Sequence, residues 1–255
     1  LAKAAQTKAA AIAADRDTEA GRADDALRRL DASEEQAEQA QQDLAAAQVA
    51  LDDCGARIAG LEEAEANADA IVIAGRPGSF CAGFELATMT SGDQEAIGEL
   101  SLAGAKILLK LYGTGKPLVA ACTGHAFTIG ALWLLACDTR IGEEGKYKFA
   151  MVETAMGMVL SDWCMEPLKA RLNPTQFLPV VTQSVTLDPA GAVDAGFLDR
   201  LVPADEVEAT ALKVAEDLVP LRYAFNTVKE YERSALLDRC RRCLEHDLEV
   251  FVERS

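Results

Sequence analysis

Residues recur at seven-residue intervals along the N-terminal part of the chain, in two rows that together form a heptad pattern. The first row is Leu30, Ala37, Leu44, Leu51 and Ile58, and the second, three residues later, is Ser33, Ala40, Ala47, Cys54 and Leu61. This is the a/d spacing of a coiled coil and predicts helix within residues 1–66. Because alanine is frequent in both rows, each layer buries little surface, and the helix needs a partner or a docking surface. Two interpretations stay open: a helix or helical hairpin that extends the first helix of the core, or a coiled coil that oligomerises the protein.

The pattern changes from Ala70 onward to short apolar runs that end in glycine. The segments "AIVIAG" at 70–75 and "KPLVAACTG" at 116–124 each predict a buried strand, because β-branched residues are bounded there by turn formers. Helical patterns lie between such runs. This alternation favours an α/β layered fold over an all-helical one.

The C-terminal part of the chain carries clear helix signals. In "DPAGAVDAG", Asp188 is placed as an N-cap before Pro189, and Gly196 is placed to end the helix. Two amphipathic helices are predicted after it. The resulting domain prediction is a helical heptad segment at 1–66, an α/β core at 67–203 and a C-terminal helical region at 204–255.

Charge and composition exclude several classes of partner. The net charge is −16 and the pI is about 4.6, so the chain should repel nucleic acid. The apolar run 118–137 is interrupted by Gly124, His125 and Gly130, and the start of the chain lacks a signal-peptide pattern. We therefore expect no membrane span and no secretion.

The chain contains seven cysteines, mostly within apolar runs, where cysteine behaves as a small hydrophobic residue. Their odd number fits a reducing compartment, and we expect a cytoplasmic protein. Cys240 and Cys243, followed by His246, have metal-ligand spacing, but the sequence offers no second cysteine pair to complete a zinc site. No metal site is predicted.

Small residues gather at two turns where a predicted strand meets a helix. They lie in "SFCAGFEL" at 79–86 and in "HAFTIGA" at 125–131. Small side chains allow a ligand to approach backbone N–H groups closely. Either turn taken alone is better explained as a tight connection between two elements.

The two turns belong to a longer series of motifs, "IVIAGRPGSFCAGFEL", "KPLVAACTGHAFTIGALWLLACDTRIG", "YKFAMVETAMGM" and "AVDAGFLDRLVP". With this series the chain resembles the enoyl-CoA hydratase/isomerase family, the crotonase superfamily, from about residue 61 to its C-terminus. The resemblance implies a crotonase-like spiral of ββα units that binds acyl-CoA and assembles as a trimer or a hexamer. It implies no cofactor, because coenzyme A is part of the substrate. Family members open with two strands, and the heptad segment stands in their place here.

The resemblance also implies which residues form the site. The shared chemistry is stabilisation of a thioester enolate by two backbone N–H groups, which map to Ala82 and Ile129. Further positions that the resemblance assigns to substrate or CoA binding are Gly83, Phe84, Glu85, Leu86, Gly130 and Lys229.

One catalytic carboxylate, Glu153, is implied by the same resemblance. Hydratases of the family use two glutamates, and the other maps to Leu132, which cannot carry a proton. Hydration uses two groups to hold and deprotonate water, whereas moving a double bond needs one base. We therefore expect Δ3-Δ2 enoyl-CoA isomerase chemistry with Glu153 as base, and enoyl-CoA hydratase as the alternative. Without the resemblance, Glu153 would be interpreted as a surface carboxylate.

Several positions keep simpler interpretations beside functional ones. Asp162 is a candidate second carboxylate and Trp163 a candidate wall of an acyl pocket, but loop surface and core packing are the favoured explanations of these two residues. His125 is best explained as a ring packed near its turn.

A different functional class also stays open. Leu132, the absent first strands and the heptads motivate a second hypothesis, in which a crotonase-like domain has lost turnover, binds CoA as a scaffold and is presented on a helical or coiled-coil arm. Thioester hydrolysis or decarboxylation is a third alternative, because one fold serves many chemistries.

Overall fold

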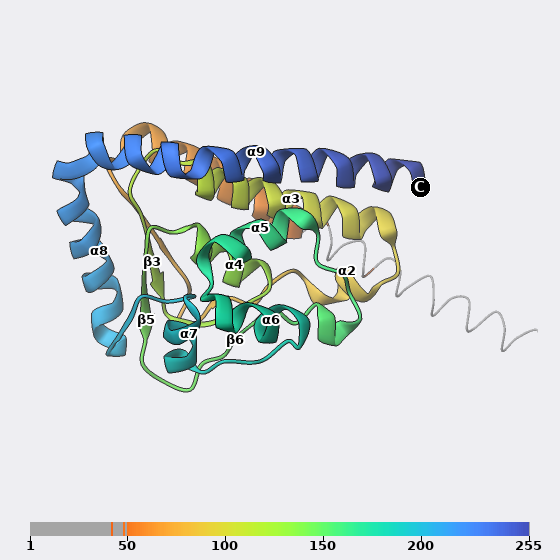
Figure 1. The fold of residues 1–255 in the computed structure, drawn as a ribbon, viewed down its shortest axis with the longest axis horizontal. Coiled ribbons are helices and arrows are strands. Elements are labelled where there is room, and N and C mark those ends of the chain that lie inside the picture. Colours follow the sequence, from red (N-terminus) through yellow and green to blue (C-terminus); the bar gives the residue numbers. More distant parts are fainter. Residues whose placement is uncertain (1–41, 43–47, 49, 255) are drawn as a thin grey trace, which may run out of the picture. The chain divides into compact units, whose positions relative to one another are not determined.

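The computed structural model describes residues 42, 48 and 50–254. The chain divides into two units, Leu1–Ala46 and Ala47–Ser255, and the second contains both sheets and all the elements labelled in Figure 1. Six heptad positions lie outside the described residues: Leu30, Ser33, Ala37, Ala40, Leu44 and Ala47. The coiled-coil interpretation, which depends on them, stays a prediction.

A parallel four-stranded sheet forms the centre of the second unit. Its strands are β1 (Ile71–Ala74), β3 (Leu118–Cys122), β5 (Thr139–Glu143) and β7 (Arg200–Val202), in that order across the sheet. Every residue of β3 is buried, which explains why "LVAAC" is apolar without alternation. The strands predicted in "AIVIAG" and "KPLVAACTG" are confirmed as β1 and β3.

A second parallel sheet follows the first step by step. Its strands are β2 (Gly78–Cys81), β4 (Gly124–Phe127) and β6 (Phe149–Ala150), and each comes directly after a strand of the larger sheet. A helix follows each of these pairs, so the chain repeats a strand–strand–helix unit. The α/β fold predicted from the alternation is confirmed.

The helices of this unit are α2 (Leu86–Thr90), α3 (Gln94–Gly113), α4 (Ile129–Ala136), α5 (Asp162–Arg171), α6 (Pro174–Thr182), α7 (Pro189–Ala195), α8 (Val207–Leu218) and α9 (Arg222–Arg254). Short 3-10 turns are η1 (Thr154–Met156), η2 (Ala204–Glu206) and η3 (Val219–Leu221). The two helices predicted after residue 204 are therefore present as α8 and α9.

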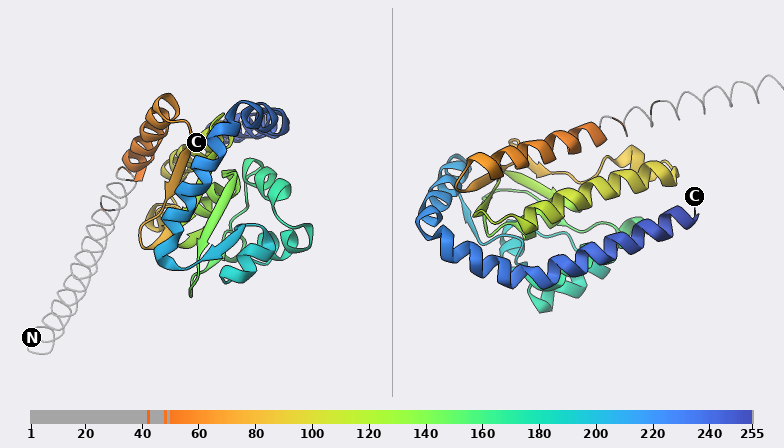
Figure 2. Two further views of the ribbon diagram at one scale, coloured as in Figure 1. Left: turned by 90° about the vertical axis from the view of Figure 1, so that its left-hand side faces the viewer. Right: turned by 90° about the horizontal axis from the view of Figure 1, so that it is seen from above.

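Helices cover both faces of the larger sheet. Apolar residues of α8 pack against β3 and β5 on one face, where Val119 and Ile141 are fully buried. On the other side α3, α9 and the helical segment 50–67 run side by side (Figure 2). The short apolar helix α4, in which even Trp133 is only 8% exposed, lies inside the main hydrophobic core.

The helical segment 50–67 shows what the heptad pattern does in the described part of the chain. Leu61 is buried in the main core, and Cys54 and Ile58 are half-buried against it. Lys110 of α3 contacts Glu62 at 3.0 Å on the outside. The heptad face of this stretch therefore packs on the core, as expected for a helix that extends the fold.

The helix signals around α7 are confirmed. The Asp188 carboxylate accepts a hydrogen bond of 2.7 Å from the Gly191 N–H, with Pro189 as the first helical residue. Gly196 ends the helix at φ 94°, a left-handed conformation that glycine adopts without steric cost.

Candidate active site

The two small-residue turns meet in space. A Cβ on Gly130, at the start of α4, would lie 2.5 Å from the carbonyl oxygen of Cys81, at the end of β2. A Cβ on Gly83, which has φ 101°, would lie 2.3 Å from the Thr128 hydroxyl oxygen. Only glycine fits at either position without a shift. The segments 81–83 and 128–130 are therefore in direct contact.

This contact places the predicted oxyanion donors on adjoining segments. Ala82 follows β2, and Ile129 is the first residue of α4, where an N–H has no partner within its own helix. Among the described residues, neither amide donates to an intramolecular acceptor. Both N–H groups therefore lack an intramolecular acceptor in this part of the chain. Ala82 lines the adjacent cavity, whereas Ile129 is 3% exposed and is not among the residues that line it.

A mostly apolar cavity of about 350 Å³ opens beside these turns. Its lining residues are Ala82, Phe84, Leu86, Met89, Ser101, Phe127, Thr128, Val152, Glu153, Met156, Met158, Val159, Leu160, Ser161, Trp163 and Cys164. Three of them are methionines, whose flexible side chains adapt to differently shaped apolar ligands. Leu86 and Val159 are 61% and 93% exposed, so the cavity has an apolar border that faces solvent.

Glu153 is the carboxylate in this cavity. It follows β6 and precedes the turn η1, and its Oε2 is buried without a hydrogen-bond partner. Burial raises the pKa of this carboxyl, since desolvation disfavours the charged form. A carboxylate with a raised pKa and an unpaired oxygen is suited to accept and return a proton.

Phe84 and Leu86 also line the cavity, as the resemblance implies. The Phe84 ring packs against Gly104 of α3, where a Cβ would lie 2.5 Å from it. Glu85, between them, points elsewhere. Its carboxylate accepts hydrogen bonds from the backbone N–H groups of Ala87 and Thr88 and so caps α2.

Replacing Glu85 with alanine is expected to lower the free energy of unfolding by about 1 kcal/mol, because α2 loses its cap. The hydrogen bond from the Thr88 N–H is the main reason that the pKa of Glu85 is lowered. The stabilisation that the Glu85 carboxylate provides is therefore fully present at pH values above the ordinary carboxyl pKa. It is lost as the pH falls through the lowered pKa of Glu85 in the folded protein. Urea unfolding at pH 7 and at pH 3 checks this, and an equal loss at both pH values would contradict it.

The remaining candidates fall in different places. Leu132 is buried in the core, so the position of the second hydratase glutamate is apolar. Trp163 does wall the cavity, whereas Asp162 is exposed in the first turn of α5 and does not line it. His125 Nδ1 accepts a hydrogen bond from the Lys148 N–H, and its ring packs on aromatic neighbours, as the simpler interpretation predicts.

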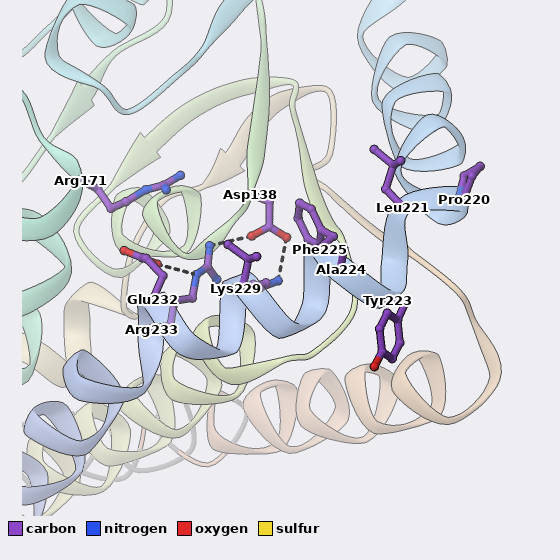
Figure 3. A pocket seen from close by; sticks show the side chains of 11 residues that line it. Asp138, Arg171, Pro220, Leu221, Tyr223, Ala224, Phe225, Lys229, Glu232 and Arg233 are labelled. Carbon is purple, nitrogen blue, oxygen red and sulfur yellow. Dashed lines mark hydrogen bonds and ion pairs between the residues drawn. The ribbon is translucent and has the colours of Figure 1, made fainter.

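Lys229 lies in α9, outside the Glu153 cavity. Its ammonium contacts Asp138 at 2.7 Å and donates to the Lys116 carbonyl oxygen at 2.7 Å. Arg233 holds the other carboxylate oxygen of Asp138 (Figure 3). Desolvation lowers the pKa of Lys229 against the opposing effect of Asp138. The structure thus gives this lysine a buried ion pair at the wall of a separate pocket, and its role in CoA binding stays a prediction.

Comparison with known proteins shows the family. A family model described as "Enoyl-CoA hydratase/isomerase" matches residues 45–254. The chain belongs to the enoyl-CoA hydratase/isomerase family. The match begins before the helical segment 50–67, which accordingly lies within the family's region of the chain.

This family member is similar to both isomerases and dehydratases. Human "Enoyl-CoA delta isomerase 1, mitochondrial" is 27% identical over 184 residues, or 71% of this chain and 61% of that protein. "Carnitinyl-CoA dehydratase" of Proteus mirabilis is 27% identical over 139 residues, or 54% of this chain and 52% of that protein. The chain spans 61–64% of the length of three mammalian isomerases that it matches.

Solved structures show the same fold. An enoyl-CoA hydratase/isomerase family protein from Pseudomonas syringae superimposes with a TM-score of 0.73 at 33% identity, covering 76% of this chain and 84% of that one. Human mitochondrial delta3-delta2-enoyl-CoA isomerase gives a TM-score of 0.74 at 25% identity, covering 80% and 81%. The crotonase-like fold that the resemblance implied for the core is confirmed.

Two expectations concern features beyond one chain. Assembly as a trimer or hexamer and a cytoplasmic location stay predictions.

None of the helices in the described residues combines the length and apolar character that crossing a bilayer requires. In the same part of the chain, no group of three or more His, Cys, Asp and Glu residues is arranged to hold a metal ion.

Sequence reasoning missed some of the residues that line the cavity. Ser101 comes from the middle of α3, and nothing in the sequence distinguishes it from a serine on the solvent-exposed face of a helix. Thr128 carried a signal: a β-branched residue stands inside a small-residue turn. Met158 belongs to the methionine-rich segment after Glu153, for which periodicity predicts no direction.

Proposed function

We propose that the protein is a CoA-thioester enzyme that shifts a double bond in the acyl chain, with Glu153 as the single acid/base group. The observation that carries this proposal is one buried, unpartnered carboxylate oxygen in an apolar cavity beside two adjoining backbone N–H groups without intramolecular acceptors. Membership of the enoyl-CoA hydratase/isomerase family supports an acyl-CoA substrate.

The proposed reaction begins with the thioester oxygen of a 3-enoyl-CoA accepting hydrogen bonds from Ala82 and Ile129. Glu153 removes a proton from C2, and the electron pair of that C–H bond moves into the thioester to form a dienolate. The protonated Glu153 then gives the proton to C4 of the dienolate. The C2–C3 double bond forms, the thioester carbonyl is restored, and a 2-enoyl-CoA results. One group serves both steps, so no second carboxylate is needed.

In this scheme the two backbone N–H groups contribute most of the electrostatic stabilisation of the dienolate. Fixed N–H dipoles in a water-excluded site stabilise the developing negative charge, and the loss of one such donor typically reduces the rate about 100- to 1,000-fold. The apolar lining strengthens this effect because it lowers the local dielectric constant.

Hydration of a 2-enoyl-CoA is the second candidate, favoured by the similarity to a dehydratase. Leu132, 1% exposed in the core, argues against it, because no carboxylate stands there to help hold water. Besides Thr128, Ser101 and Ser161 are the lining residues that carry a hydroxyl. A hydratase would have to order its water with them.

The test follows both reactions with the full chain in D₂O. Deuterium incorporation at C2 of a saturated acyl-CoA, read by mass spectrometry, reports enolate formation. Conversion of a 3-enoyl-CoA to the conjugated isomer, read by ultraviolet absorbance, reports isomerisation. Conversion of a 2-enoyl-CoA only to the 3-hydroxyacyl product would favour the hydratase. Thioester binding with neither exchange nor turnover would favour the scaffold alternative.

A further inference from the structure

Thr128 has a backbone conformation that is unusual for its residue type. Its φ is 50° and its ψ is −118°, the geometry of the first central residue of a type II′ turn, where glycine is normally required. Apart from glycines, only Thr128 and Ser184 have positive φ among the described residues. A β-branched residue in this conformation costs free energy and persists only where its surroundings enforce it.

The side chain of Thr128 adds a second unfavourable feature. Its hydroxyl oxygen is buried and has no hydrogen-bond partner, although nearly all buried polar atoms in folded proteins have one. The same residue lines the cavity that contains Glu153. Strain and an unsatisfied polar group thus coincide at one residue of the site.

The contacts of Thr128 connect the parts of that site. Its hydroxyl fills the space in which a Cβ on Gly83 would lie, one residue after the Ala82 amide. Its own N–H donates to the Ala150 carbonyl oxygen at 3.0 Å, at the end of the strand that leads to Glu153. The next residue along the chain is Ile129, the other predicted donor.

From these contacts we infer that Thr128 is a positioning residue. Its side chain acts as a spacer between the segments 81–83 and 128–130 and sets the separation of the Ala82 and Ile129 amides. Its strained backbone directs the Ile129 N–H toward the bound oxygen. The inference rests on the proposed function only in assuming that these amides receive a thioester oxygen.

The test compares two substitutions by a readout that needs binding but no turnover. The CoA thioester of hexa-2,4-dienoic acid is bound to the full chain, and its absorbance band moves to longer wavelength when its carbonyl is polarised. Thr128→Gly removes both the spacer and the strain. We expect it to lose more than half of the band shift while Tm rises by at least about 2 °C, because backbone strain is relieved. Thr128→Val keeps the side-chain shape without the hydroxyl and should retain most of the shift.

Turnover and a matched control complete the design. Isomerisation by Thr128→Gly should fall about tenfold or more in kcat, because displacing a donor costs less than the about 100- to 1,000-fold that is typical of losing one outright, with KM changed less than threefold. Ser184→Gly removes the other positive-φ side chain, which lies outside the cavity, and should leave the band shift unchanged.

The outcomes separate this inference from the proposed function. If the wild-type protein binds the dienoyl thioester without any band shift, the placement of the oxygen at the two amides fails, and the proposed function fails with it. If the wild type gives the shift and Thr128→Gly gives the same one, the spacer is refuted while the proposed function stands. Loss of the shift in Thr128→Val would also refute the spacer, because the hydroxyl itself would then be required.

Discussion

Replacing Glu153 with glutamine is expected to reduce both C2 proton exchange and isomerisation by about 100- to 10,000-fold, the range associated with loss of a positioned general base. Glutamine has nearly the same shape, so the cavity and the two amides keep their places. It has no basic oxygen that can take a proton from C2. Exchange into a saturated acyl-CoA is the cleaner measurement, since it isolates the first proton transfer.

Glu144→Gln provides the control, because Glu144 is an exposed glutamate outside the cavity. It should leave the exchange rate within a factor of two. If Glu153→Gln retains wild-type exchange, another group is the base, and the isomerase mechanism proposed for Glu153 is wrong. Binding of a saturated acyl-CoA by the variant should stay close to wild type and so shows that the cavity is intact.

The same substitution has an expected effect on stability. Burial raises the pKa of Glu153 in the folded state, so the native protein binds this proton more tightly than the unfolded chain. Between the ordinary and the raised pKa, stability therefore falls as the pH rises. Glu153→Gln should consequently be more stable than wild type at pH 8, with the difference vanishing below the ordinary carboxyl pKa. Equal denaturant midpoints for the two proteins at pH 8 would contradict this.

Replacing Asp138 with alanine is expected to lower the free energy of unfolding by about 3–5 kcal/mol, as is typical when one partner of a buried ion pair is removed. Its side chain is 8% exposed and lies between Lys229 and Arg233, whose side chains are 5% and 3% exposed. The Leu118 N–H also donates to it at 2.8 Å. The substitution removes the buried carboxylate from Lys229 and Arg233, which among the described residues keep hydrogen bonds only to backbone carbonyl oxygens. It also leaves the Leu118 N–H without its acceptor.

Equilibrium unfolding in urea measures this loss. Asp194→Ala, in which an exposed aspartate of α7 is removed, is the control and should change the free energy of unfolding by less than about 0.5 kcal/mol. If the two variants are equally stable, the ion pairs of Asp138 with Lys229 and Arg233 contribute little to the free energy of unfolding. A role of Lys229 in CoA binding, as the resemblance implied, would then be favoured. A large loss with intact CoA affinity in the residual folded protein would favour a structural role.

Much of the core was predictable because its signals are local. The runs that became β1 and β3 are apolar and bounded by turn residues, and the Asp188 and Gly196 signals act within a few residues of their helix. The strand β4, with the sequence GHAF, lacks the β-branched apolar residues that marked β1, and β6 contains only two residues, which is too short for any periodicity to indicate a strand. Their pairing depends on the larger sheet beside them.

The heptad pattern shows the same division. Spacing alone indicates an apolar helix face but not what covers that face. In residues 50–67 the cover is the core, with Leu61 buried in it. Tertiary packing decided this, because the same alanine-rich face would also suit a partner helix.

The family, the two small-residue turns and the single glutamate could be predicted, since these are properties of residue type and order. The packed fold was needed to show that Gly83 touches Thr128, that Gly130 touches Cys81, and that Glu85 and Lys229 have partners outside the cavity. Such contacts join segments far apart in the chain, or depend on the direction of a side chain. Neither is encoded in local spacing, because burial and hydrogen bonding are settled only when the whole core packs.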